Sequence, residues 1–309
     1  MGDKLMKTSW RPGHDMKESW RHFMAADKKE LVKHFWRELT HNGLVNFLRM
    51  DLYRAFVSRV FPLAVLGMTF MLLISVNHQI NELNIDVAYL HMVSQSSAFN
   101  DIFYVLAALP FAAAFCLDWN HQFLKPLLIR GSAVPYAVSK IVACALSGFA
   151  TVALGETLFI LVLRLKVPLV YPKGPAFLST VQFTHGTLLA DGHSVLYFVI
   201  HIVGMSLGAA FYAVLALLVS TKFQNVFVVL ASPMILAVTF RTLSDTLFAW
   251  LPTWATPTVV LIGRSVLENK SGVPLPVWSF LYETVVFWLV GIPLSLLIIR
   301  QLKRRMAYG

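Results

Sequence analysis

The chain has 309 residues, of which 57% are hydrophobic and only 14% are charged, and its mean hydropathy is +0.65. Soluble domains carry about a quarter charged residues, so this composition excludes an ordinary soluble enzyme and indicates a polytopic membrane protein. Two cysteines exclude a scaffold built on disulfides, and a net charge of +10 is typical of basic cytoplasmic flanks rather than of nucleic-acid binding.

The N-terminal part of the chain is polar and basic, and residues 1–26 are predicted to form a cytoplasmic tail. Asp27 and Glu30 match a capping box, in which both side chains accept hydrogen bonds from free backbone amides of the first helical turn. Hydrophobic residues then recur at helical spacing among lysines and arginines, and a helix of this kind can lie in the headgroup plane of a membrane. We therefore predict an amphipathic connecting helix over residues 27–59. A helix packed on a soluble partner is the alternative.

Six hydrophobic windows approach or exceed the length of about 20 residues that a helix needs to cross a bilayer. They lie at Val60–Val76, Ile102–Leu117, Ile141–Leu163, Val195–Ser220, Val226–Trp250 and Val277–Ile299. The expected fold class is therefore an all-α polytopic membrane protein. Its six transmembrane helices occupy residues 60–300, and a basic cytoplasmic tail follows at residues 301–309.

Lysine and arginine are distributed unequally between alternate loops. With a cytoplasmic N-terminus, 20 of these residues fall inside and 5 outside, and Arg241 lies within a span. The positive-inside rule therefore predicts that both termini are cytoplasmic.

The inner loop between the second and third spans, residues 118–140, is too polar to cross a membrane. Its hydrophobic residues share one face of a short predicted helix that Gly131 can end, and these residues are Phe123, Leu124, Leu127 and Leu128. An apolar face on a cytoplasmic helix favours a docking partner. A simple interfacial turn is the alternative.

The outer segment before the last span contains four prolines around the hydrophobic stretch Val259–Ile262. This stretch is too short to cross the membrane. We predict a re-entrant segment here, since irregular backbone at membrane depth is tolerated where protein covers it.

Two sequence motifs of enzymes and nucleotide-binding proteins are absent from the chain. It contains no HExxH zinc motif and no GxxxxGK[ST] phosphate loop, and its GxSxG match, Gly204–Gly208, lies inside the fourth predicted span. We therefore predict no catalytic residue, no metal and no directly bound cofactor.

Five ionisable residues lie within the predicted spans, all in their outer halves: Glu156, His201, Arg241, Asp245 and Glu283. Such residues are costly in hydrocarbon and usually face protein or water. They could line a polar outer chamber that releases cargo, or they could lock helices together. Arg241 and Asp245 are four residues apart on one helical face, so the structural interpretation is preferred for this pair. Gly204 and Gly208 form a GxxxG pattern that permits close helix packing.

The layout resembles the membrane subunits of type-2 ATP-binding-cassette (ABC) exporters, a class of bacterial permeases. The resemblance covers residues from about Asp27 to the C-terminus and rests on the order of the amphipathic helix, six spans, inner helical loop and Pro-rich outer segment. Local sequence is also similar at Asp118, Arg130, Gly131, Tyr136, Ser139, Lys140, Lys222, Asn225 and Pro233. Residues 1–26 depart from the family pattern.

The resemblance implies that the inner loop carries a coupling helix, and that Phe123, Leu124, Leu127, Leu128 and Arg130 contact a separate ATPase subunit that holds ATP and Mg. It also implies a second permease chain, identical or related, membrane lipid as surroundings, and a place in the bacterial cytoplasmic membrane. The expected function is export of an amphiphilic or hydrophobic cargo such as a drug, peptide or lipid.

Two other functions stay open. A polytopic membrane enzyme or an assembly factor without ATP coupling would need a catalytic pair such as Glu156 with His201. A secondary transporter would be expected to carry an inverted repeat, and the first three and last three spans share no visible pattern.

Overall fold

The computed structural model describes residues 43–80, 85–95, 100–123, 133–172, 174–182, 185–247, 250 and 276–308. Within these residues the protein is helical and contains no strand. The helices are α3 (Gly43–Phe56), α4 (Val60–Ser75), α5 (Val87–Gln95), α6 (Asn100–Ala108), α7 (Ala114–Asn120), α9 (Ala133–Arg164), α10 (Pro175–Gln182), α11 (Thr187–Ala190), α12 (Ser194–Ser220), α13 (Val226–Leu247) and α15 (Pro276–Tyr308).

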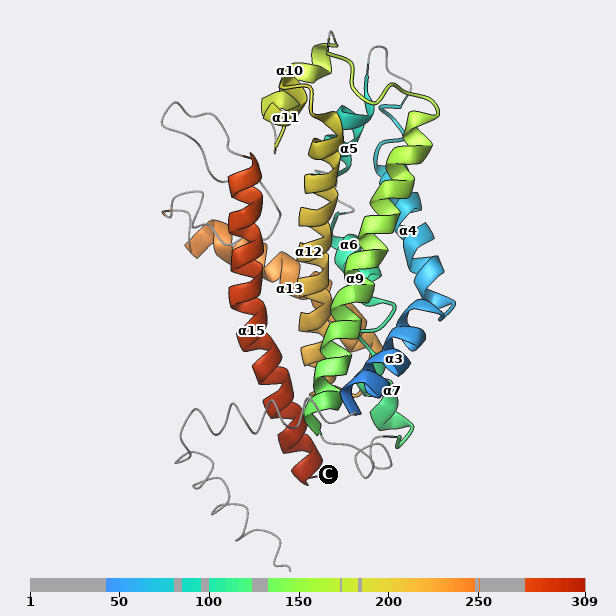
Figure 1. The fold of residues 1–309 in the computed structure, drawn as a ribbon, viewed down its shortest axis with the longest axis vertical. Helices are drawn as coiled ribbons and strands as arrows, with labels where there is room; N and C mark the ends of the chain where they lie inside the picture. The colour runs from blue at the N-terminus through green and yellow to red at the C-terminus, as the bar shows by residue number, and fades with distance from the viewer. Residues whose placement is uncertain are drawn as a thin grey trace, which may run out of the picture.

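The long helices α9 and α12 pack against each other at the centre of the molecule, and α4, α6, α13 and α15 surround them (Figure 1). The short helices α5, α10 and α11 gather at one end, which we call the α5 end. Helices α3 and α7 and the C-terminal part of α15 lie at the opposite end, which we call the α3 end (Figure 1). The hydrophobic core has two parts, one toward each end, and α9 and α12 contribute to both.

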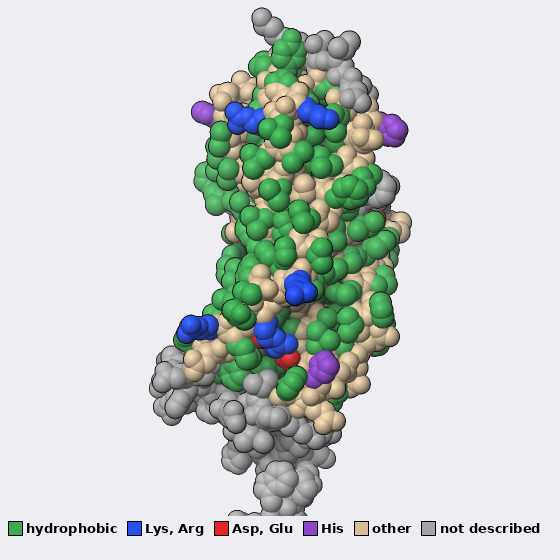
Figure 2. All heavy atoms as spheres, turned by 90° about the vertical axis from the view of Figure 1, so that its right-hand side faces the viewer, with side chains coloured by type: hydrophobic (Ala, Val, Ile, Leu, Met, Phe, Trp, Pro, Cys, Tyr) green, Lys and Arg blue, Asp and Glu red, His purple; other side chains and the backbone are tan. Residues whose placement is uncertain are grey.

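Four described helices are long and apolar enough to cross a membrane: Ala133–Arg164, Ser194–Ser220, Val226–Ser244 and Val277–Leu302. A fifth crossing is available if Leu44–Phe56 and Val60–Ser75, bent by 49° relative to each other, act as one broken span. Figure 2 shows a broad belt of hydrophobic side chains, with lysine and arginine confined to positions above and below it. The chain therefore has the features of a multi-pass membrane protein.

The second predicted span, Ile102–Leu117, is divided in the structure, so the expected six continuous spans are not all present. Helix α6 ends at Ala108, turns occupy residues 109–113, and α7 begins at Ala114. Pro110 lies in this break, where its ring and its missing amide hydrogen weaken the helix by removing a backbone hydrogen bond. Neither α6 nor α7 is long enough to cross a bilayer by itself.

Other predicted elements are described in part by the structure. The helix that includes the last predicted span continues to Tyr308, so residues 301–308 of the predicted basic tail are helical. Of the predicted amphipathic helix at 27–59, the structure describes α3. The tail at 1–26, the apolar face from Leu124 onward and the predicted re-entrant stretch Val259–Ile262 lie outside the described residues.

Two glycines of α9 allow the neighbouring helices to approach closely. A Cβ added at Gly155 would lie 2.5 Å from Met68 Cγ and 2.7 Å from Met68 Cβ on α4. A Cβ added at Gly148 would lie 3.0 Å from Ala213 Cβ on α12. Next to Gly155, the Thr69 hydroxyl donates to the Gly155 carbonyl oxygen across 3.1 Å. The predicted GxxxG of α12 behaves differently at Gly204, where the nearest atom to an added Cβ is a Glu283 oxygen at 3.8 Å.

We expect Gly155→Ala to lower the free energy of unfolding by about 1–3 kcal/mol, because overpacking a close helix contact forces backbone or side-chain shifts. Gly291→Ala is the matched control, since a Cβ at Gly291 meets nothing within 4 Å. The measurement is thermal unfolding of both purified variants. Equal unfolding temperatures would show that the α4–α9 contact does not depend on glycine.

Candidate functional site

The α3 end contains a cluster of buried charges, which we call the inner ion cluster. The ammonium of Lys140 on α9 lies 2.7 Å from Asp51 Oδ1 on α3 and 2.8 Å from Asp118 Oδ2 on α7. The guanidinium of Arg54 donates to Asp118 Oδ1 across 2.9 Å. The Lys140 and the two carboxylate side chains are each at most 1% exposed.

Hydroxyl groups and aromatic rings complete the inner ion cluster. The Tyr136 hydroxyl donates to Asp118 Oδ2 across 2.9 Å, and the Ser139 hydroxyl donates to Asp51 Oδ2. The Lys140 ammonium also lies 5.1 Å from the ring centre of Phe111. The two cations balance the two carboxylates, and the carboxylate oxygens accept several hydrogen bonds, which is the arrangement that makes buried charge tolerable.

Asp118 lies outside the candidate spans, and its acidity reflects these neighbours. Burial acts to raise the pKa of the Asp118 carboxyl, but the Lys140 ammonium and the Arg54 guanidinium outweigh burial and hold the pKa below its usual value. Asp118 is therefore ionised at neutral pH and can hold α3, α7 and α9 together.

A second polar cluster lies within the helices nearer the α5 end, and we call it the outer polar cluster. Glu156 on α9 lies 3.5 Å, Oε2 to Nε2, from His91 on α5, and its Oε1 accepts a hydrogen bond of 3.1 Å from the Gln95 amide. The ring centres of His91 and His201 on α12 are 4.6 Å apart. Glu156, His91 and His201 are all buried. The structure thus brings together two residues that the sequence analysis selected, Glu156 and His201.

His91 and Gln95 were missed by the sequence analysis because their segment lies between the first and second predicted spans and was not expected to be buried. The structure instead places α5 against the core of the α5 end. Asp86 holds this helix in position, because its carboxylate accepts one hydrogen bond from the Tyr89 amide and another from the Tyr171 amide, both 2.8 Å. Backbone bonds from Val87 and Ala88 to the 168–169 segment add to this clamp. In the sequence, the Asp before the run Val87–Val93 could have indicated the start of a helix, because Asp is a favoured N-cap residue.

Glu283 on α15 faces α12 beside the outer polar cluster. Its side chain is 1% exposed, and neither carboxylate oxygen has a hydrogen-bond partner among the residues that the structure describes. Glu283 Oε2 is the nearest atom to a Cβ built on Gly204, and Gly204 lies one turn beyond His201 on α12. Helix α12 carries other buried polar atoms that have no described hydrogen-bond partner. They are both ring nitrogens of His201, the Tyr197 hydroxyl and the Ser206 hydroxyl.

Arg241 has a partner that the sequence analysis did not consider. Its guanidinium contacts both carboxylate oxygens of Asp101, at 2.6 and 2.8 Å, and so joins α13 to α6. Asp101 lies in the first turn of α6, where the helix dipole also favours a negative charge. Neither Glu156 nor Glu283 forms a described ion pair with Arg241, and the side chain of Asp245 lies outside those described. The Asp101 contact is consistent with a structural role for Arg241, and the predicted pairing with Asp245 stays a prediction.

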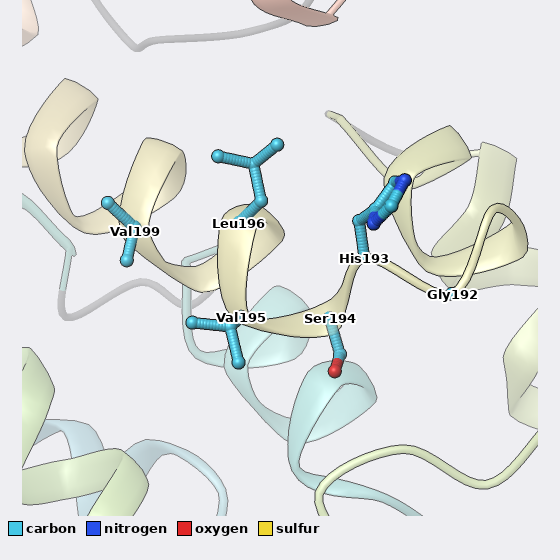
Figure 3. A pocket seen from close by; sticks show the side chains of 6 residues that line it. All are labelled: Gly192, His193, Ser194, Val195, Leu196 and Val199. Carbon is cyan, nitrogen blue, oxygen red and sulfur yellow. The ribbon is translucent and has the colours of Figure 1, made fainter.

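An open pocket of about 420 Å³ lies at the α5 end of α12, lined by Gly192, His193, Ser194, Val195, Leu196 and Val199 (Figure 3). Its hydrophobic lining comes from the first turns of α12, and no carboxylate contributes to it. Val199 and His201 are two residues apart, about 200° around the helix, so this pocket and the outer polar cluster lie on different faces of α12.

The predicted coupling residues, the two cysteines and possible metal ligands are considered last. Phe123 is 59% exposed at the end of the segment that follows α7, whereas Leu124, Leu127, Leu128 and Arg130 lie outside the described residues. Cys116 and Cys144 are buried, and neither forms a disulfide with another described residue. Within the described part of the chain, no group of three His, Cys, Asp or Glu side chains is arranged to hold a metal ion.

We expect Lys140→Met to lower the free energy of unfolding by about 3–5 kcal/mol, because Asp51 and Asp118 would be left as buried, undercompensated carboxylates. Thermal unfolding of the full chain in detergent measures the loss. Lys222→Met removes the same charge from an exposed turn and should change stability by less than about 0.5 kcal/mol. Similar unfolding temperatures for the two variants would show that the inner ion cluster does not stabilise the fold.

For the Arg241–Asp101 pair we expect Arg241→Leu and Asp101→Leu to destabilise by about 1–3 kcal/mol each, since either change leaves a partly buried charge without its partner. The double variant should recover part of the loss, which a double-mutant cycle of thermal stabilities reveals. Arg241→Leu combined with Asp191→Leu, which alters an exposed acid elsewhere, should be additive. Additivity in both cycles would contradict a structural pair.

Comparison with protein-family models, with curated proteins and with solved structures finds no match for this chain. Its function is therefore inferred from the two clusters and from the elements that they join.

Proposed function

We propose that this chain is the membrane permease subunit of an ABC exporter. In this proposal it moves an amphiphilic or hydrophobic cargo out of the cell, and a separate ATPase subunit binds ATP and Mg and supplies the energy. A second permease chain, identical or related, completes the transport path. The α3 end faces the cytoplasm, both termini are cytoplasmic, and the protein resides in the bacterial cytoplasmic membrane.

The observation that carries this proposal is the inner ion cluster. Asp118 lies at the end of α7, just before the loop at residues 121–132, while Tyr136, Ser139 and Lys140 lie in the first turns of α9, just after it. Asp51 brings α3 into the inner ion cluster, and α4 follows α3 after a 49° bend. The cluster thus joins both ends of this loop to the helix that precedes the first span.

This geometry suits a chain that is driven from one side of the membrane. A partner that displaced the 121–132 loop would act at once on α7, α9 and α3, because well-compensated buried ion pairs resist separation. Phe123 presents a large exposed apolar surface at the start of the loop. An exposed apolar residue on a cytoplasmic segment is suited to a docking contact.

The test is purification of the tagged chain from its native membrane, followed by measurement of co-purified ATPase activity. We expect a phosphate-loop ATPase subunit in the complex and a loss of at least tenfold in its ATP hydrolysis with Phe123→Asp, Leu124→Asp or Leu128→Asp. The reason is that each change buries a charge at the contact. Phe223→Asp is the matched control, because Phe223 is also exposed at the α3 end, in the turn between α12 and α13.

Two outcomes would contradict the proposal. One is a purified chain without any phosphate-loop ATPase. The other is full ATP hydrolysis in all three loop variants, which would show that this loop does not couple the two subunits.

The outer polar cluster favours one other candidate, a membrane enzyme without ATP coupling. Glu156 Oε2 lies 3.5 Å from His91 Nε2, and the ring of His201 adjoins that of His91, so a carboxylate and two imidazoles that could serve as general acid and base are close together. An enzyme of this kind would turn over its substrate without ATP. The co-purification experiment separates the two candidates.

A further inference from the structure

Glu283 is the starting point, because its carboxylate is buried at membrane depth without a partner. It lies seven residues after the start of α15, or roughly 10 Å along the helix. No hydrogen-bond donor contacts either oxygen, and among the described residues no lysine or arginine forms an ion pair with it. An ionised carboxylate in such a place is strongly unfavourable unless a cation joins it.

The backbone of α12 leaves room beside this carboxylate. A Cβ on Gly204 would meet a single neighbouring atom, Glu283 Oε2 at 3.8 Å, which is an ordinary van der Waals separation. By contrast, Gly155 on α9 is tightly filled by Met68. Gly204 therefore provides space next to an acid instead of a close helix contact.

Polar groups on α12 lie close to this carboxylate. His201 lies one turn from Gly204 on α12, and beyond it His91 contacts Glu156, the second buried acid. A carboxylate without a described partner suits a cation, and no described lysine or arginine forms an ion pair with it.

We propose that Glu283, with the space beside Gly204, binds the cationic group of an amphiphile, such as an ammonium or guanidinium. The term cargo for this amphiphile rests on the proposed exporter function. The ligand carries an apolar part because Glu283 lies on a helix whose other faces are hydrophobic and exposed, for example at Leu281 and Val285. A purely polar cation would not enter such surroundings, whereas an amphiphile partitions into them.

The test is isothermal titration of the full chain in lipid nanodiscs with dodecylammonium, with empty nanodiscs as the reference. Dodecanol and dodecanoate have the same chain length and carry no charge and a negative charge, respectively. We expect saturable binding of dodecylammonium alone. Glu283→Gln should weaken it at least tenfold, and Gly204→Leu should do the same by filling the space while the acid is retained.

Asp191→Asn is the matched control, because it removes one exposed carboxylate near the α5 end and should leave the affinity unchanged. Thermal unfolding of each variant confirms that it is folded. Equal binding of the three amphiphiles, or wild-type affinity in folded Gly204→Leu and Glu283→Gln, would overturn the site.

The titration requires neither ATP nor a partner subunit, so its result is independent of the coupling experiment. Charge-selective binding in a chain that fails to couple would retain the cation site and remove the exporter. Intact coupling without charge-selective binding would overturn the cation site alone.

Discussion

The fold depends most directly on the position of Lys140, which is held between Asp51 and Asp118 inside the α3 end. An ammonium at most 1% exposed is stable only where opposite charges and hydrogen bonds replace its hydration. Meeting that requirement places α3, α7 and α9 within a few ångströms of one another. The break between α6 and α7 at Pro110 belongs to the same arrangement, because it lets α7 bring Asp118 to Lys140.

Buried carboxylates are paired much more completely at the α3 end than toward the α5 end. At the α3 end, two carboxylates meet two cations and the hydroxyls of Tyr136 and Ser139. Toward the α5 end, Glu283 has no described partner, and Glu156 has only a histidine and an amide. The first arrangement is typical of a fixed structural joint, since each group is already satisfied. The second leaves binding capacity in a place where it is costly, and that is typical of a functional site.

Several features could be predicted from the sequence because they depend on composition and helical period. Helices α9, α12, α13 and α15 contain four of the predicted spans, and Glu156 and His201 were selected as intramembrane polar residues. Long hydrophobic runs need no tertiary information, since a bilayer requires about 20 apolar residues in a row. The same reasoning failed for residues 102–117. This hydrophobic run is divided near Pro110, and its two halves pack in different parts of the core.

Pairings between distant residues could not be predicted in the same way. Arg241 was expected to pair with Asp245 because residues four apart share a helical face, whereas its contact with Asp101, which is 140 positions away, was not foreseen. His91 was missed because its segment is too short and too polar for a span, although it is buried by contacts with α9 and α12. In both cases the deciding interaction is tertiary, and a pattern within one helix contains no information about it.

Helix α9 connects the two clusters and gives them a common mechanical element. Lys140 and Glu156 are sixteen residues apart on this single helix, or roughly 24 Å along its axis. Between them, Gly148 and Gly155 keep α9 in close contact with α12 and α4. A shift of α9 at its Lys140 end would therefore move Glu156 relative to His91, which the Asp86 clamp holds to the 168–171 segment. In the proposed exporter, this helix is the direct physical route by which a movement imposed on the inner ion cluster would alter the outer polar cluster.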